Sequence, residues 1–139
     1  MKTEFIDLVS RKHRVMRDAL REELQCSFHH DFTRHESYLL FLANKDQYSI
    51  SKMACVMGVS RQAVHKISKK LNKEGFVTFE EMPGNKKEKL IQLTKLGIEY
   101  CEFDRKAKRK IERQIKKVLG EEAFLNLKEF LVQDWLGIP

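Results

Sequence analysis

The apolar positions of this chain recur with two different periods, and each period predicts one type of element. In residues 3–27, apolar side chains recur at steps of three and four, which is the spacing of one helix face. The same spacing predicts a shorter helix in residues 33–43, a long helix in residues 95–117 and a last helix after Gly120. The predicted inward stripe of the first helix is Phe5, Val9, Met16, Leu20 and Leu24, and that of the last helix is Phe124, Leu127, Leu131 and Trp135.

Two shorter helices are predicted in the middle of the chain, in residues 49–57 and 60–73. Ser49 and Ser60 are good N-caps, because a serine hydroxyl accepts a hydrogen bond from a free amide of the first helical turn. Gly58 ends the first of the two helices, since glycine tolerates the left-handed backbone that a helix end often adopts.

A period of two follows these helices and predicts a β-hairpin. Residues 76–79 and 90–93 are rich in β-branched and aromatic side chains, as strands are. Between them, Pro83 and Gly84 fit the two central positions of a type II turn. The tip of the hairpin is basic, with Lys86, Lys87 and Lys89.

Residues 50–69 meet the requirements of a helix-turn-helix, in which two helices cross steeply through a short turn. Ala54 is small enough for the point of contact, and Gly58 suits the turn. Apolar side chains stand at the offsets that fill the shared core, namely Met53, Met57, Val59, Val64 and Ile67. An ordinary helical hairpin has the same packing needs, so the outward face of the second helix must decide between the two.

That outward face has the composition of a DNA-reading helix. With Val64, Ile67 and Leu71 facing inward, the opposite side is long, polar and mostly cationic, and no Asp or Glu occurs in residues 61–73. Arg and Gln read base edges in the major groove, and Lys holds phosphates. We therefore predict groove contacts by Arg61, Gln62, His65 and Lys66, and phosphate contacts by Ser60, Lys69, Lys86 and Lys87. A solvated helix face and a solvated lysine turn are the alternatives.

The distribution of charge points the same way. The 139 residues carry a formal net charge of +7, and residues 50–95 hold 10 basic and 4 acidic side chains, a local excess of +6. A localised positive field attracts a polyanion and speeds its capture. The length predicts one compact domain with a real hydrophobic core.

Several classes of protein are disfavoured by what the sequence lacks. It has no apolar run of 18 residues and no apolar signal core near its first residue, so we expect no membrane association. Three cysteines without CxxC spacing are typical of reduced thiols, which favours a cytoplasmic protein. No Gly-rich phosphate loop, metalloprotease motif or nucleophile elbow is present, so we expect neither catalysis nor a cofactor.

Residues 50–97 resemble the winged helix of the multiple-antibiotic-resistance regulator (MarR) family. The strand Leu90–Leu93 followed by Thr94-Lys95-Leu96-Gly97 gives the pattern Leu-Thr-x-x-Gly, which is fairly specific to that family. The other matching pieces are Met53-Ala54, Gly58-Val59-Ser60, Val64 and Leu71-Asn72-Lys73-Glu74-Gly75-Phe76-Val77. The family's wing usually carries Asp-x-Arg at its tip, whereas this chain has Asn85-Lys86-Lys87, which favours simple phosphate contact over minor-groove reading.

The resemblance implies a mainly α fold, a winged helix-turn-helix with N- and C-terminal dimerisation helices. Residues 1–48 and 95–139 would dimerise, and residues 49–94, with Asn85 among the contacts, would bind DNA, all within one compact domain. It further implies a homodimer on palindromic double-stranded DNA, acting as a repressor. A cleft between the dimerising and DNA-binding parts would take a small-molecule effector that changes DNA affinity.

Three alternatives stay open. A winged helix can serve as a protein-interaction module without DNA binding. Metal sensing would use Cys26, His29, His30, His35 and Glu36, although their spacing matches no standard site. Redox sensing would use Cys26, Cys55 or Cys101, the last lying one place from the inward stripe of its helix. The basic residues of 105–117 either extend the DNA footprint or form a solvated face.

Overall fold

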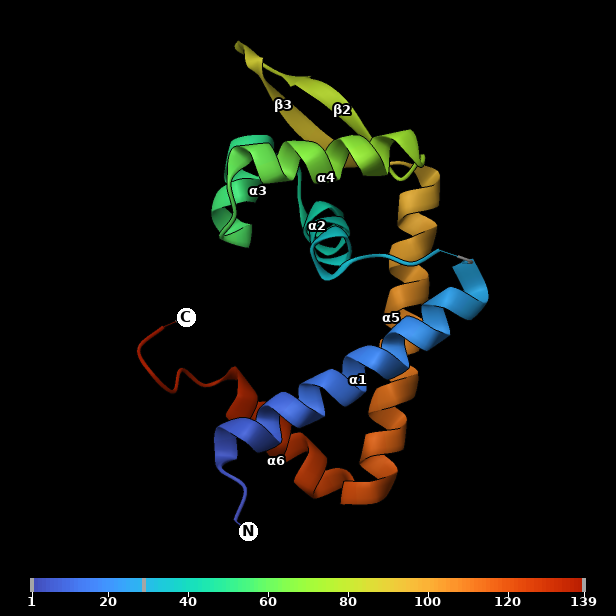
Figure 1. Cartoon of the computed structure of the whole chain (residues 1–139), viewed down its shortest axis with the longest axis vertical. Coiled ribbons are helices and arrows are strands. Elements are labelled where there is room, and N and C mark those ends of the chain that lie inside the picture. The colour runs from blue at the N-terminus through green and yellow to red at the C-terminus, as the bar shows by residue number, and fades with distance from the viewer. Residues whose placement is uncertain (1, 29, 139) are drawn as a thin grey trace.

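The computed structural model describes residues 2–28 and 30–138, which form six helices and a three-stranded sheet (Figure 1). The helices are α1 (Phe5–Phe28), α2 (Arg34–Lys45), α3 (Ile50–Met57), α4 (Arg61–Lys73), α5 (Lys95–Leu119) and α6 (Glu121–Val132). The strands are β1 (Tyr48–Ser49), β2 (Val77–Met82) and β3 (Asn85–Leu93). The predicted mainly helical fold with a small β-wing is confirmed.

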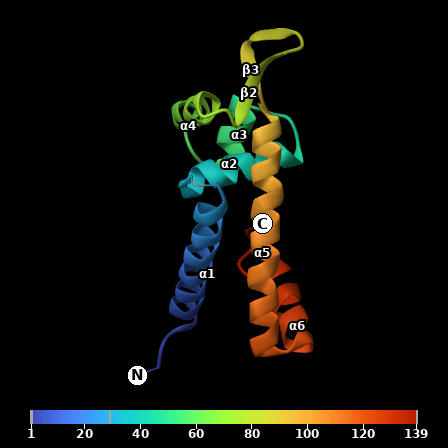
Figure 2. The same ribbon diagram turned by 90° about the vertical axis from the view of Figure 1, so that its right-hand side faces the viewer.

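The elements gather at two ends of the molecule. At one end, α2, α3, α4 and the sheet pack together, with the β2–β3 hairpin projecting beyond them (Figure 1). From there α1 and α5 extend as two columns, and α6 folds back beside the far half of α5 (Figure 2). An ion pair between Lys110 Nζ and Glu23 Oε1, 2.6 Å apart, joins the two columns.

The helix-turn-helix forms where the local signals predict it. The Ser49 hydroxyl accepts a hydrogen bond from the Lys52 amide, and the Ser60 hydroxyl accepts one from the Ala63 amide. Gly58 has the left-handed backbone that the turn requires, with φ 67°. Side chains that face the shared core are buried as expected, among them Met53, Ala54, Val64 and Leu71.

The sheet has the antiparallel strand order β1-β3-β2. Its first strand, Tyr48–Ser49, was not predicted, because two residues give no periodic signal; it pairs with Ile91 and Leu90 of β3. The hairpin itself is longer than predicted, and its register shifts between Glu81 and Met82, which marks a bulge in β3.

The Leu-Thr-x-x-Gly segment joins the wing to α5 by two close contacts. The Thr94 hydroxyl accepts a hydrogen bond from the Gly97 amide as N-cap of α5, and it donates one to the Gly75 carbonyl oxygen at 2.6 Å. A Cβ atom on Gly97 would lie 2.3 Å from the Phe76 carbonyl oxygen, so only glycine fits without a shift of the backbone. The motif is therefore a packing requirement of the strand-to-helix connection.

The terminal helices leave much of their predicted inward stripe exposed. Leu20 and Leu24 are buried, but Phe5, Val9 and Met16 are 64%, 41% and 40% exposed. Within one copy of the chain, only the C-terminal half of α1 buries its apolar side chains against other elements. The assignment of Trp135 to the last helix is wrong, since α6 ends at Val132. Trp135 instead packs its ring against Phe5, with centroids 5.8 Å apart.

Among the described residues, no helix has the length and apolar character needed to cross a lipid bilayer.

Candidate nucleic-acid interface

The outward face of α4 is open to solvent along its length. Val64, Ser68 and Leu71 turn inward and are fully buried, which fixes the rotation of the helix about its axis. All the α4 side chains predicted to contact DNA are exposed, namely Arg61, Gln62, His65, Lys66 and Lys69, together with the cap Ser60. None of these side chains is therefore packed inside one copy of the chain.

Not every cation of α4 is free on this face. Lys70 Nζ donates to Glu36 Oε1 at 2.6 Å, so this lysine ties α4 to the N-terminal turn of α2. Glu36 in turn belongs to the capping box of α2, where its other carboxylate oxygen accepts the Thr33 amide. Beside them, His30 Nε2 lies 2.9 Å from Glu74 Oε2 at the C-terminal cap of α4. No pattern in the sequence indicates the Lys70–Glu36 and His30–Glu74 pairs, because the members of each pair lie far apart along the chain.

Arg61 has a partner that sequence reasoning missed. One terminal nitrogen of its guanidinium lies 3.3 Å from Glu88 Oε2 on β3, while the Arg61 side chain as a whole stays 60% exposed. Glu88 is only 13% exposed, and its other oxygen accepts the Ser51 amide at 2.9 Å. That hydrogen bond to the backbone at the start of α3, more than the nearby guanidinium, holds the pKa of Glu88 below its usual value.

The wing places its basic tip at the far end of the hairpin. Gly84 has φ 79° in the turn, and the Asn85 side-chain oxygen accepts the Lys87 amide at 3.2 Å. Asn85 thus orders the tip by a local turn hydrogen bond. Lys86 and Lys87 are exposed, whereas Lys89 lies 3.4 Å from Glu81 and is partly engaged.

The comparisons with known proteins agree with this geometry. The family model described as "MarR family" matches residues 36–89, from α2 to the wing. We call residues 36–89 the MarR-like segment. No curated protein sequence matches the chain.

Solved structures share the fold over nearly the whole chain, beyond the MarR-like segment. Wild-type MarR from E. coli, in its apo form, is 19% identical with a TM-score of 0.76, covering 94% of this chain and 96% of that one. A substituted MepR from S. aureus bound to an oligodeoxyribonucleotide is 16% identical, with a TM-score of 0.67 and 94% coverage of both chains. The transcriptional regulator Tm0710 from Thermotoga maritima is 18% identical, with a TM-score of 0.62, covering 90% of this chain and 89% of that one.

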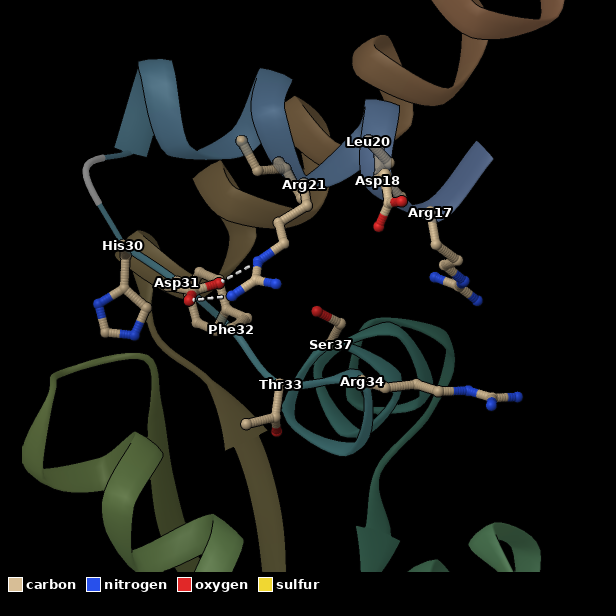
Figure 3. A pocket seen from close by; sticks show the side chains of 11 residues that line it. Arg17, Asp18, Leu20, Arg21, His30, Asp31, Phe32, Thr33, Arg34 and Ser37 are labelled. Atoms are coloured by element: carbon tan, nitrogen blue, oxygen red, sulfur yellow. Dashed lines mark hydrogen bonds and ion pairs between the residues drawn. The ribbon is translucent and has the colours of Figure 1, made fainter. Parts of the chain in front are cut away.

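A cavity lies beside the C-terminal half of α1. Its volume is about 400 Å³, and it opens between α1, the segment before α2 and the first turn of α2 (Figure 3). Arg21 reaches from α1 to Asp31, donating from Nε at 2.7 Å and also through a terminal nitrogen; this pairing lowers the pKa of the Asp31 carboxyl and raises that of the arginine. Arg17 and Arg34 lie on the side of the opening away from Asp31 (Figure 3).

The candidate sensor residues are scattered in the structure. His29 lies outside the described residues; within residues 2–28 and 30–138, no group of three or more His, Cys, Asp or Glu is placed to hold a metal ion. Cys26 and Cys55 are exposed. Cys101, one place after the stripe residue Tyr100, is buried as well. Its thiol lies 3.5 Å from the Leu40 carbonyl oxygen, and burial raises its pKa to about 11. A thiol with so high a pKa is a poor nucleophile near neutral pH.

Proposed function

We propose that this protein is a homodimeric transcription regulator that binds double-stranded DNA in a sequence-specific manner. The observation that carries the proposal is the exposed face of α4, which is polar, largely cationic and free of acids, with the basic wing tip on the same end of the molecule. Arg61, Gln62, His65 and Lys66 would enter the major groove, and Ser60, Lys69, Asn85, Lys86 and Lys87 would contact the backbone. That a similar chain, MepR, was solved with an oligodeoxyribonucleotide supports the same use of the fold.

A homodimer is proposed because the terminal helices expose several large apolar side chains. Ile6 is 72% exposed, and Phe130 and Leu131 of α6 are 56% and 57% exposed. Contiguous apolar patches of this kind mark protein interfaces. Two copies joined through α1 and α6 would place their α4 helices on successive major grooves, about 10–10.5 base pairs apart, and so read a palindrome.

Selection of bound sequences from a random duplex pool tests both parts of the proposal at once. We expect an enriched palindrome with half-sites about one helical turn apart. A mobility shift at low and moderate salt then compares the selected duplex with a random one. If the winged helix is instead a protein-interaction module, the pool yields no enriched sequence and the shift disappears equally for both duplexes as salt rises.

We also propose that an acidic small molecule in the cavity beside Arg17 and Arg34 lowers DNA affinity, relieving repression. The cavity supports this because its walls come from α1 on one side and from the first turn of α2 and the segment before it on the other. A panel of small carboxylates, with their uncharged amides as controls, is added to the protein bound to its selected duplex. At least one carboxylate should weaken binding by the wild type and not by Arg34→Ala; equal effects of acids and amides would contradict the proposal.

A further inference from the structure

Glu88 is an acid placed inside a surface that is otherwise basic. It lies on β3 within the bulge, between the paired residues Asn85 and Lys89. A bulge turns a side chain out of the regular alternation of its strand. Here the Glu88 carboxylate points away from the hairpin tip and reaches the beginnings of α3 and α4.

The carboxylate is held in place by α3. β1 pairs with β3 through Ser49 and Leu90, and the chain then turns into α3. The Ser51 amide at this turn would otherwise lack a partner, and Glu88 Oε1 accepts it at 2.9 Å. A negative charge at a helix N-terminus is favourable, so Glu88 stays ionised and fixed.

The Arg61 side chain contacts the carboxylate of Glu88. Glu88 Oε2 accepts one of the five N–H groups of the Arg61 guanidinium at 3.3 Å, which leaves the others for DNA. Arg61 is the first residue of α4, the end of a recognition helix whose side chains reach base edges. A free arginine would have to give up its rotamer freedom on binding, whereas a pre-oriented one loses less.

We propose that Glu88 is a positioning residue that orients the Arg61 guanidinium for base recognition, and that it thereby raises sequence specificity at some cost in overall DNA affinity. The inference rests on the proposed function, since it assigns a role within the same DNA-reading surface. The cost arises because a carboxylate repels the phosphate backbone, so removing its charge should help binding to any duplex. The gain arises because a bidentate contact to guanine needs the planar guanidinium in one orientation.

The test compares Glu88→Gln with Arg61→Ala on the duplex selected by the wild type and on a random duplex. Gln keeps an oxygen for the Ser51 amide but loses the charge that holds Arg61. We expect Glu88→Gln to lower the preference for the selected duplex about tenfold, in the range of one base contact, while affinity for the random duplex is equal or higher. Arg61→Ala should lose the same preference but bind the random duplex more weakly.

Two further readouts separate positioning from a merely structural role. Selection repeated with Glu88→Gln should relax base preference at the same positions as with Arg61→Ala. The double variant should show no further loss of preference beyond Arg61→Ala, because the two residues act through one contact. Arg61→Lys, at an exposed position, tests the pair without touching the fold and should also lose the preference.

Glu81→Gln is the matched control, because it removes the same charge from the same hairpin at a site that contacts Lys89 and not Arg61. It should leave the preference unchanged. An unchanged preference in Glu88→Gln, or losses in the two single variants that simply add, would overturn the inference while leaving the proposed function intact. A wild type that prefers no sequence would overturn the proposed function and this inference with it.

Discussion

The two ends of this molecule differ in how far their apolar side chains are buried within one copy of the chain. Around the winged helix, Leu39, Met53, Val64 and Leu71 are completely buried by elements of the same chain. In α6, Phe124 is buried against the rest of the chain, while Leu125, Leu127, Phe130, Leu131 and Val132 remain exposed. The winged-helix end is thus complete in one copy of the chain, whereas the other end has an exposed apolar surface.

Because of this difference, we expect the stability of a single copy and the association of copies to depend on different residues. A substitution in the core of the winged helix should destabilise a single copy of the chain. A substitution on the exposed face of α6 should change association and leave a single copy folded. The predictions below test this division, from the largest expected effect to the smallest.

Leu71→Ala should lower the free energy of unfolding by about 2–5 kcal/mol, because it leaves a cavity at a fully buried position. Leu131→Ala, at a side chain 57% exposed, is the matched change in α6 and should alter monomer stability by less than about 0.5 kcal/mol. Urea unfolding at low protein concentration measures both. Similar losses in the two variants would contradict the division.

Phe130→Glu should weaken dimerisation at least about a hundredfold, because it would bury an unpaired charge in the proposed interface. Light scattering over a dilution series measures the association, and circular dichroism checks that the fold is kept. Lys128→Glu is the control for a changed charge on the same helix, because residues two positions apart lie on nearly opposite sides of a helix and the Lys128 side chain is 54% exposed. A dimer of undiminished stability in Phe130→Glu would place the interface elsewhere.

In the winged helix, Arg61→Ala should lower affinity for the selected duplex by about 1–3 kcal/mol and relax base preference. Lys87→Ala should weaken binding to all duplexes and reduce the slope of log affinity against log salt by about 0.9. Binding titrations at several salt concentrations distinguish these effects. If both variants bind as the wild type does, the two assignments are wrong.

The smallest effect concerns pH. Because the pKa of Glu88 is lowered in the folded chain, its ionised form stabilises the fold above the ordinary value of 4.5, and this contribution is lost as pH falls through the lowered pKa. Glu88→Gln should therefore show a smaller loss of stability between pH 6 and pH 3 than the wild type. Unfolding curves at several pH values measure this, with Glu81→Gln as the control.

Much of the fold could be predicted because its signals are local. The caps Ser49, Ser60 and Thr94 each accept an amide three residues further on, and Gly58 ends α3 where its position predicts. The predicted helix boundaries lie within a few residues of the observed ones, although the second helix was predicted for residues 33–43 and α2 continues to Lys45. Hydrogen bonds between near neighbours leave such signals in the sequence.

The partners of the charged residues left no such signals. Nothing in the sequence distinguishes Lys70, which is bound to Glu36, from Lys69, which lies on the open face. Neighbours on one helix differ in direction by about 100°, so their surroundings depend on what packs against each side. The burial of Cys101 against the Leu40 carbonyl oxygen has the same origin, because α2 and α5 meet there.

The sequence by itself determined the order of the elements, their caps and turns, and the cationic character of the α4 face. The tertiary structure decided which of those cations stay free, which acid contacts Arg61, and which apolar stripes remain uncovered. The reason is physical: propensity and capping act over three or four residues, whereas Arg61 and Glu88 are 27 positions apart and meet only because β3 passes beside the first turns of α3 and α4.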